Sequence, residues 1–218
     1  MTGTDALAEL ESLARRGVSW GQYSGPLTTV GSGSIPAAVL LLFGQGAGSV
    51  VDPDDLDLLF LERASTLREH PGQVAFPGGR IDMGDRDPAA AALREAQEET
   101  AVDPAGVRVL GELSPVPLPV SDYRVVPVLG WWEEPSPVHP VDLAESARVF
   151  RVPVSELIAP ENRANAQLNR GGRTVMGPAF KVAGTVIWGF TGIILADLLG
   201  ELGWAVPWDV EATVEVRP

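Results

Sequence analysis

The stretch VAFPGGRIDMGDRDPAAAALREAQEET, residues 74–100, combines a short apolar segment, a glycine pair and a long segment that favours helix. We expect a strand over 73–76 that ends at Pro77-Gly78-Gly79, which we interpret as a turn. A helix should begin at Asp87, a good N-cap residue, with Pro88 at the first helical position. The alanine-rich sequence that follows has high helix propensity throughout. The face expected to pack on a sheet consists of Ala89, Leu93, Ala96 and Thr100.

Three glutamates lie on one side of this helix. Glu95, Glu98 and Glu99 occupy positions i, i+3 and i+4, so their carboxylates share one part of the helix surface. The three charges repel one another unless a cation lies among them, and Arg94 alone cannot neutralise all three. An arbitrary E-x-x-E-E is an ordinary solvated acidic face. Here a strand and a Gly-Gly turn precede it, and such a turn lets a phosphate or metal approach the backbone, so the sequence predicts a metal–phosphate site.

Residues 79–102 resemble the Nudix box, which is usually written G-x5-E-x7-R-E-U-x-E-E-x-G-U. In this chain the segment reads Gly79-x5-Asp85-x8-Arg94-Glu95-Ala96-Gln97-Glu98-Glu99-Thr100-Ala101-Val102. Asp85 replaces a glutamate, the spacing to Arg94 is one residue longer, and Ala101 replaces a glycine. None of these departures removes a principal metal ligand. The resemblance implies an α/β fold, the Nudix-type α/β/α sandwich with a mixed sheet.

The resemblance also implies roles for individual residues. Bound Mg²⁺ or Mn²⁺ would neutralise pyrophosphate oxygens and lower the pKa of an attacking water. Arg94 would orient Glu95 and Glu98 rather than contact substrate. The general base is left open between Glu95 and a loop acid, Glu145. The implied metal ligands are the Gly79 carbonyl, Glu95, Glu98 and Glu99.

The segment before the box narrows the expected substrate. It reads Arg63-x3-Leu67-Arg68-x-His70-x-Gly72-Gln73-Val74-Ala75-Phe76-Pro77-Gly78-Gly79 and resembles the signature of coenzyme A pyrophosphatases within the Nudix superfamily. The extra residue before Arg94 is also typical of that branch. Three later segments resemble it as well, so the likeness extends over about residues 37–200. They are 121–128, 145–153 and 187–191.

Basic residues of this segment suit a substrate rich in phosphate. Coenzyme A carries a pyrophosphate and a 3′-phosphate, and arginines bind phosphates through bidentate contacts. Each residue alone also has an ordinary explanation: Arg68 can pair with Glu69 or Glu62, His70 can be structural, and Gln73 can cap the loop. Taken together, the predicted substrate-binding residues are Arg63, Arg68, His70, Gln73 and Arg80.

Strands and helices alternate along the rest of the chain. The continuous apolar run 37–43 predicts a strand buried on both faces, and the mixture as a whole predicts an α/β sandwich with a mixed sheet. We interpret 160–175 as a polar loop. Further strands are expected at 57–63, 107–113, 123–132 and 148–153, and a hairpin at 176–187. Helices are expected near the N-terminus, with Leu7, Leu10 and Leu13 on one side, and at 192–203.

The composition limits the kinds of metal site and partner. The chain has no cysteine, which excludes disulfides, thiolate metal sites and cysteine nucleophiles. Only His70 and His139 carry imidazole, so any metal should be hard and oxygen-bound. The net charge of −13 disfavours a nucleic-acid partner. We find no signal peptide or membrane span and therefore expect a cytoplasmic location.

We expect one domain over residues 1–218, with an N-terminal arm at 1–36 and a C-terminal tail at 204–218. Trp204 and Trp208 in the tail suggest a lid or a homodimer contact. The leading functional hypothesis is hydrolysis of coenzyme A or acyl-coenzyme A to 3′,5′-ADP and (acyl-)4′-phosphopantetheine. A second is hydrolysis of another nucleoside diphosphate derivative, such as ADP-ribose or a dinucleotide. A third, a catalytically silent binding module, is disfavoured by the intact REAQEE core at 94–99.

Overall fold

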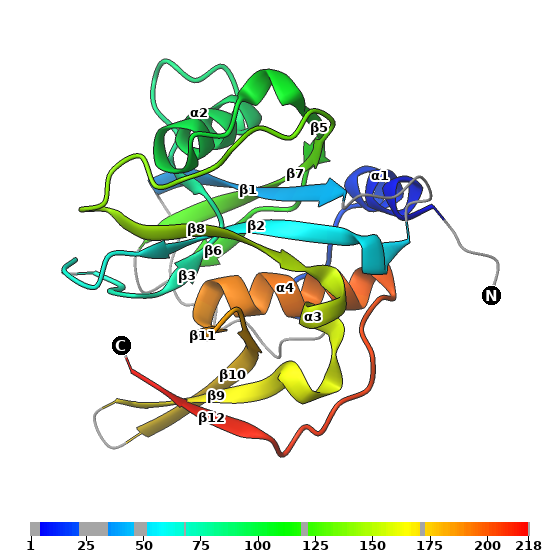
Figure 1. Cartoon of the computed structure of the whole chain (residues 1–218), viewed down its shortest axis with the longest axis vertical. Helices are drawn as coiled ribbons and strands as arrows, with labels where there is room; N and C mark the ends of the chain where they lie inside the picture. Colours follow the sequence, from blue (N-terminus) through cyan, green and yellow to red (C-terminus); the bar gives the residue numbers. More distant parts are fainter. Residues whose placement is uncertain are drawn as a thin grey trace.

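Strand β1 (Ile35–Gln45) lies in the middle of the larger of two sheets, which we call sheet A (Figure 1). The computed structural model describes residues 5–21, 35–45, 52–67, 69–118, 122–170 and 173–217, without the side chains of Arg170 and Arg173. β1 is apolar almost throughout because both of its faces are covered. Ala38, Leu40 and Leu42 pack in one buried cluster, and Leu41 and Phe43 pack in the other. The expectation of a strand buried on both faces is confirmed.

Sheet A is mixed. β1 runs parallel to β7 (Tyr123–Trp132) and antiparallel to β2 (Leu56–Arg63), and β2 pairs antiparallel with β8 (Ser146–Pro153). Tyr123 lies opposite the first residue of β1, so β7 begins at the same edge of the sheet as β1. The other strands of sheet A are β3 (Val74–Ala75), β4 (Gly78–Arg80), β5 (Val107–Glu112) and β6 (Val116–Leu118).

Helix α2 (Pro88–Thr100) covers one face of sheet A (Figure 1). The Asp87 side chain accepts a hydrogen bond from the Ala90 N–H at 2.7 Å, which confirms the predicted N-cap. The helix ends at Ala101, whose φ of 60° places it in the left-handed region. Small side chains let the helix backbone lie close to the sheet. Those buried along α2 are Ala89, Ala91, Ala92, Ala96 and Thr100, whereas Leu93 is partly buried.

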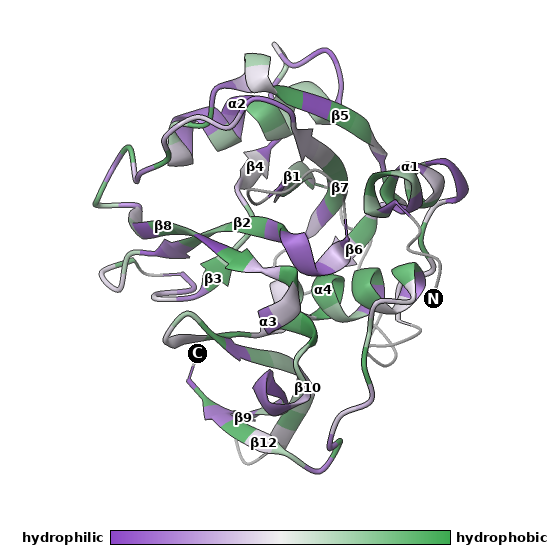
Figure 2. Cartoon of the chain, turned by 45° about the vertical axis from the view of Figure 1, so that its right-hand side comes forward, coloured by the Kyte–Doolittle hydropathy of each residue, from purple (hydrophilic) through white to green (hydrophobic). Residues whose placement is uncertain are grey.

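Helices α1 (Ala6–Arg16) and α4 (Gly189–Leu202) lie on the opposite face of sheet A (Figure 1). Leu10 and Leu13 of α1 are fully buried, as their spacing predicts. α4 is hydrophobic around most of its circumference because a second sheet covers its other side (Figure 2). Helices on both faces of sheet A confirm the expected α/β/α arrangement. Short helical segments occur at Val154–Ile158 (α3), Pro53–Asp55, Pro104–Gly106 and Pro160–Asn162.

The second sheet, sheet B, corrects one prediction. Residues 160–175 are not a polar loop, because β9 (Arg163–Arg170) pairs antiparallel with β10 (Arg173–Val182). The inward-facing residues of β9 include Ala164 and Ala166, both buried, so the strand is apolar on one face with very small side chains. Its composition therefore resembles that of a loop. β11 (Thr185–Ile187) completes the predicted hairpin with β10, and β12 (Thr213–Val216) in the tail runs parallel to β9.

A second correction concerns Pro77-Gly78-Gly79, which we predicted to be a turn. Gly78 and Gly79 begin β4 and pair antiparallel with Val39 and Ala38 of β1. Gly78 has a φ of +156°, and a Cβ on it would lie 2.3 Å from the Ala38 carbonyl oxygen. Only glycine lets β4 lie this close to β1, so the glycines serve a strand rather than a turn.

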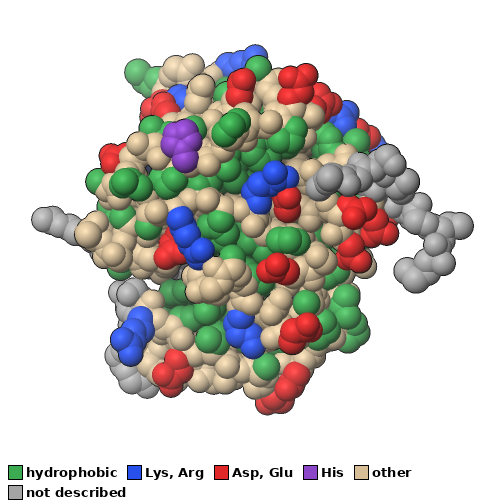
Figure 3. Space-filling model, viewed as in Figure 1, with side chains coloured by type: hydrophobic (Ala, Val, Ile, Leu, Met, Phe, Trp, Pro, Cys, Tyr) green, Lys and Arg blue, Asp and Glu red, His purple; other side chains and the backbone are tan. Residues whose placement is uncertain are grey.

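The described surface is mixed in charge. Acidic and basic side chains are interspersed among hydrophobic ones on the face shown in Figure 3. Among the described helices, none is long and apolar enough to cross a membrane.

Candidate active site

A cleft of about 420 Å³ lies where β2, β4, α2 and the start of β7 meet. Its walls carry charges of both signs. The acidic residues that line it are Asp82, Glu95, Glu99 and Glu145, the basic ones are Arg63 and Arg80, and the others are Leu67, Gly78, Gly79 and Tyr123.

Glycine at position 79 makes room for the acidic side of the cleft. A Cβ on Gly79 would lie 2.5 Å from the carboxyl carbon of Glu95 and 2.6 Å from both of its oxygens. Any larger residue would push the Glu95 carboxylate away from the β4 backbone. The glycine pair therefore brings the backbone of β4 into contact with the carboxylates of α2.

Glu99 is the most deeply buried carboxylate of the cleft. One of its oxygens accepts a hydrogen bond from the Gly78 N–H at 2.9 Å. The pKa of Glu99 is raised to about 7, chiefly by burial and in part by the nearby charges of Glu95 and Glu145, although the Gly78 hydrogen bond and Arg63 act in the opposite direction. A buried carboxylate of this kind favours a bound proton or cation.

Glu95 and Glu98 differ in their surroundings although they share the helix face. The Glu95 side chain is 19% exposed and lines the cleft, and burial raises its pKa. The Glu98 side chain is 58% exposed and does not line the cleft. The structure thus places Glu95 and Glu99 together, with Glu98 at the outer edge of the cluster.

Arg94 connects the helix to the loop before it. Its guanidinium donates two hydrogen bonds to Asp85, at 3.1 and 2.9 Å, and further bonds to Glu95 at 2.9 Å and Glu98 at 3.1 Å. It also donates to the carbonyl of Arg80 at 3.0 Å. The Asp85 hydrogen bonds raise the pKa of Arg94 and lower that of Asp85. Arg94 is therefore occupied within the protein and does not line the cleft.

The donor atoms of the acidic wall are those that a hard divalent cation prefers. Within the described ranges, no three carboxylate or imidazole side chains already enclose an ion-sized space. The carboxylates are instead hydrogen-bonded within the protein. Glu95 and Glu98 accept from Arg94, and Glu99 accepts from the Gly78 amide. The buried carboxyl of Glu99 close to Glu95 nevertheless fits a cation, which would offset the burial that chiefly raises both pKa values and the repulsion from neighbouring carboxylates.

Basic residues also line the cleft. Arg63 is one of them, and within the described part of the chain its buried Nε has no hydrogen-bond partner. Arg80 is exposed, and its Nε donates to the Tyr123 hydroxyl at 3.0 Å. His70 and Gln73 are not among the residues that line the cleft; the His70 ring nitrogen Nδ1 lies 3.0 Å from Gln73 Oε1. Arg68, the remaining predicted substrate ligand, lies outside the described residues.

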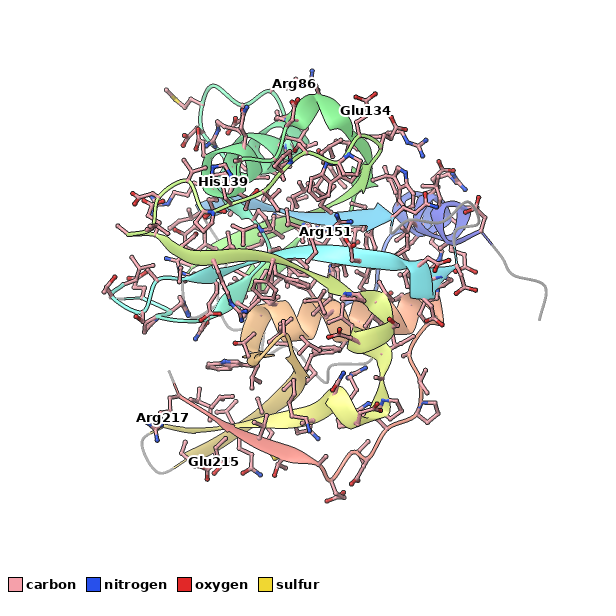
Figure 4. The ribbon with its side chains drawn as sticks, viewed as in Figure 1. Arg86, Glu134, His139, Arg151, Glu215 and Arg217 are labelled. Carbon is pink, nitrogen blue, oxygen red and sulfur yellow. The ribbon has the colours of Figure 1, made fainter. Side chains whose placement is uncertain are left out.

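Glu145 reaches the cleft from the loop between β7 and β8. Backbone N–H groups of His139, labelled in Figure 4, and of Val141 donate to the carbonyls of Thr100 and Glu99, so the loop follows the end of α2. The Glu145 carbonyl then accepts from the Ala64 N–H at 2.8 Å. These contacts hold an exposed carboxylate in the cleft that Glu99 also lines.

Four residues that line the cleft were not predicted as site residues, namely Leu67, Gly78, Asp82 and Tyr123. Leu67 and Gly78 are fixed positions of the motifs from which the site was predicted, whereas Asp82 and Tyr123 match no fixed position. Tyr123 enters because β7 begins beside the start of β1, which no local pattern shows. Only the long-range pairing of strands brings it to Arg80.

Comparison with known proteins agrees with this arrangement. The NUDIX domain model matches residues 42–170. The chain is 38% identical over 154 residues to the uncharacterized Nudix hydrolase NudL of Cronobacter sakazakii, covering 71% of this chain and 79% of that protein. It is 46% identical over 102 residues to NudL of Pectobacterium atrosepticum, covering 47% and 52%.

A solved structure of a Nudix hydrolase from Nitrosomonas europaea aligns with a TM-score of 0.49 and 13% identity, covering 84% of this chain and 79% of that one. Likeness at this level carries no information about substrate. The family assignment rests instead on the domain match, which covers more than half of the sequence, and on the NudL relatives. Together they show that this chain belongs to the Nudix family of hydrolases.

Proposed function

We propose that this chain hydrolyses the pyrophosphate bond of coenzyme A or acyl-coenzyme A, giving 3′,5′-ADP and the corresponding 4′-phosphopantetheine. The observation that carries the proposal is a cleft lined both by Arg63 and Arg80 and by Glu95, Glu99 and Glu145. A pyrophosphate needs positive charge to bind its oxygens and carboxylates to bind the metal. The coenzyme A class itself rests on the resemblance of residues 63–79 to the signature of that branch.

The acidic residues of the cleft would bind Mg²⁺ or Mn²⁺. Glu95 and Glu99 would be the principal ligands, the Gly79 carbonyl and Glu98 would complete the set, and Arg94 orients Glu95 and Glu98 through its hydrogen bonds. A divalent cation bound there would neutralise pyrophosphate oxygens and lower the pKa of the attacking water. The proton of that water passes to a carboxylate, for which Glu145 and Glu95 are the candidates because both line the cleft.

The basic residues of the cleft would bind the phosphate oxygens of the substrate. Arg63 lines the cleft, and its buried Nε has no partner among the described residues, so a hydrogen bond from this guanidinium to a substrate oxygen would be favourable. Arg80 also lines the cleft. His70 and Gln73 bond to each other and shape the loop beside the cleft.

Product analysis tests the proposed reaction. The protein is incubated with Mg²⁺ and coenzyme A, ADP-ribose or NADH, and the products are separated by chromatography. Release of 3′,5′-ADP from coenzyme A at the highest kcat/KM of the three supports the proposal. A preference for ADP-ribose or NADH would transfer the same chemistry to another nucleoside diphosphate derivative. Absence of cleavage in all three would favour a binding module.

A second comparison tests whether the cleft binds the 3′-phosphate of coenzyme A. A charge-assisted hydrogen bond to a phosphate contributes about 1.5–3 kcal/mol, so dephospho-coenzyme A should have a KM roughly ten- to a hundredfold higher than coenzyme A. Arg63→Ala or Arg68→Ala should remove most of this preference if either residue makes the contact. Equal kcat/KM values for the two substrates would leave the coenzyme A assignment to the resemblance alone.

A further inference from the structure

Arg80 and Tyr123 come from strands on opposite sides of β1. Arg80 of β4 lies opposite Ala37, and Tyr123 of β7 lies opposite Ile35. Ile35 and Ala37 are two residues apart on one strand, so all four side chains leave the sheet on the same face. Ala37 is small and 5% exposed, which leaves room above it for Arg80 to reach Tyr123.

Arg80 is fixed at both its backbone and its side chain. Its carbonyl accepts a hydrogen bond from Arg94 at 3.0 Å, which ties it to the acidic helix. Its Nε donates to the Tyr123 hydroxyl at 3.0 Å, and its guanidinium carbon lies 5.7 Å from the centre of the Tyr123 ring. Among the described residues, the two terminal nitrogens of Arg80 form no hydrogen bond or ion pair. Arg80 and Tyr123 both line the cleft.

We propose that Tyr123 is a positioning residue that holds the guanidinium of Arg80 so that its two terminal nitrogens bind a phosphate group of the substrate. The proposal rests on the proposed function, because it assumes that a pyrophosphate compound occupies this cleft. An exposed arginine normally samples many rotamers, and binding a phosphate would restrict them. A hydroxyl that already restrains Nε removes part of this loss of freedom, so Tyr123 should increase affinity without contacting the substrate.

The expected effect therefore falls on substrate binding. Tyr123→Phe keeps the ring and removes only the hydroxyl that accepts from Arg80. One hydrogen bond of ordinary strength corresponds to about a fivefold rise in KM, and kcat should stay within about twofold because the contact is the same in ground and transition states. Arg80→Gln removes the phosphate contact itself and should raise KM by roughly ten- to a hundredfold.

A double-mutant cycle separates positioning from direct contact. Steady-state kinetics are measured for wild type, Tyr123→Phe, Arg80→Gln and the double variant, with the substrate that the product analysis identifies. If Tyr123 acts through Arg80, Tyr123→Phe has no further effect on KM in the Arg80→Gln background. Arg108→Lys is the control for a change at an arginine outside the cleft, since Arg108 pairs with Glu11 and Glu133.

Two results would overturn the inference. The first is an equal rise in KM for Tyr123→Phe with and without Arg80, which would mean that the hydroxyl contacts the substrate directly. The second is an unchanged KM in Tyr123→Phe. Calorimetric titration with inorganic pyrophosphate and Ca²⁺ provides a readout without turnover: wild type should bind more tightly than Tyr123→Phe, and Tyr123→Phe more tightly than Arg80→Gln, whereas equal affinities would refute the role. If the protein fails to cleave coenzyme A, only the proposed function is refuted. The pyrophosphate titration still tests the role of Tyr123.

Discussion

Glu99 carries the clearest electrostatic signature of the cleft, a carboxyl whose pKa rises from 4.5 to about 7 because it is buried beside Glu95. In the folded, metal-free protein this group binds its proton more tightly than in the unfolded chain. It therefore stabilises the fold below about pH 4.5, and this contribution is lost as the pH rises through about 7. The total is on the order of 3 kcal/mol, since one pKa unit corresponds to about 1.36 kcal/mol.

The substitution Glu99→Gln tests the raised pKa of Glu99 and its role in metal binding, through measurements of both stability and activity. In chelator, the free energy of unfolding of the wild type should fall between pH 5 and 8 relative to the variant, when both are measured by urea denaturation at each pH. Added Mg²⁺ should restore wild-type stability at pH 8 and leave Glu99→Gln nearly unaffected. The variant should lose kcat by orders of magnitude, and excess EDTA should abolish wild-type turnover. If the free energies of unfolding of wild type and Glu99→Gln change in the same way with pH, and kcat is unchanged in the variant, the metal binds elsewhere.

Glu145 lines the same cleft as Glu99 and has an exposed carboxylate, which suits the transfer of a proton from water. If it is the general base, Glu145→Gln should reduce kcat by roughly 10²–10⁴-fold, with little change in the Mg²⁺ concentration that gives half-maximal rate. Glu161→Gln, at another exposed position, serves as the control. A loss smaller than about tenfold in kcat would assign the base to Glu95.

At the scale of the element, α2 ends on a residue that does not suit its conformation. Ala101 is the C-cap with φ 60° and ψ 18°, and its N–H donates to the Gln97 carbonyl. A side chain in the left-handed region is destabilised by about 1 kcal/mol, whereas glycine adopts this conformation without strain. Ala101 is also one of the three departures from the Nudix box, where it replaces a glycine.

Ala101→Gly should therefore stabilise the protein, by about 0.5–1 kcal/mol, which corresponds to a rise in Tm of about 1–4 °C for a chain of this size. Ala90→Gly, in the first turn of the same helix, is the matched control and should destabilise it by up to about 1 kcal/mol. Differential scanning calorimetry of the three proteins compares them directly. Destabilisation by both substitutions would contradict the assignment of Ala101 as a strained cap.

At the scale of the whole molecule, the C-terminal tail is part of the fold. Trp204 is 8% exposed, its ring meets Phe43 of β1 edge-on at 6.1 Å between centres, and its Nε1 donates to Glu9 of α1. Trp208 lies 5.1 Å from the guanidinium carbon of Arg163. The expectation that these tryptophans form a lid or a homodimer contact does not hold for Trp204, which is buried within its own chain.

Trp204→Ala should lower the free energy of unfolding by about 3–5 kcal/mol, because it leaves a cavity between α1, α4 and sheet A. Val210→Ala, at a position in the same tail that is 61% exposed, should change it by less than about 0.5 kcal/mol. Urea unfolding measures both, and size-exclusion chromatography should show the same elution volume for all three proteins. A shift in elution for Trp204→Ala alone would restore the interface hypothesis.

The sequence by itself determined the parts of this protein whose signals are local. The N-cap at Asp87, the helix that carries Glu95 and Glu99, and the doubly buried β1 all follow from short-range propensity and periodicity. These are contacts between residues a few positions apart, so a pattern in the chain describes them. The basic residues before the box were also recognised from the sequence, although only Arg63 and Arg80 among those described line the cleft.

The tertiary structure decided what depends on pairing between distant strands. β9 is a strand because it pairs with β10 and β12, and β4 is a strand because Gly78 fits against β1. Tyr123 joins Arg80 because β4 and β7 flank the same end of β1. Burial of Glu99, which sets its charge, likewise comes from residues far away in the chain. Such contacts depend on which surfaces meet after folding, and residue spacing along the chain does not encode them.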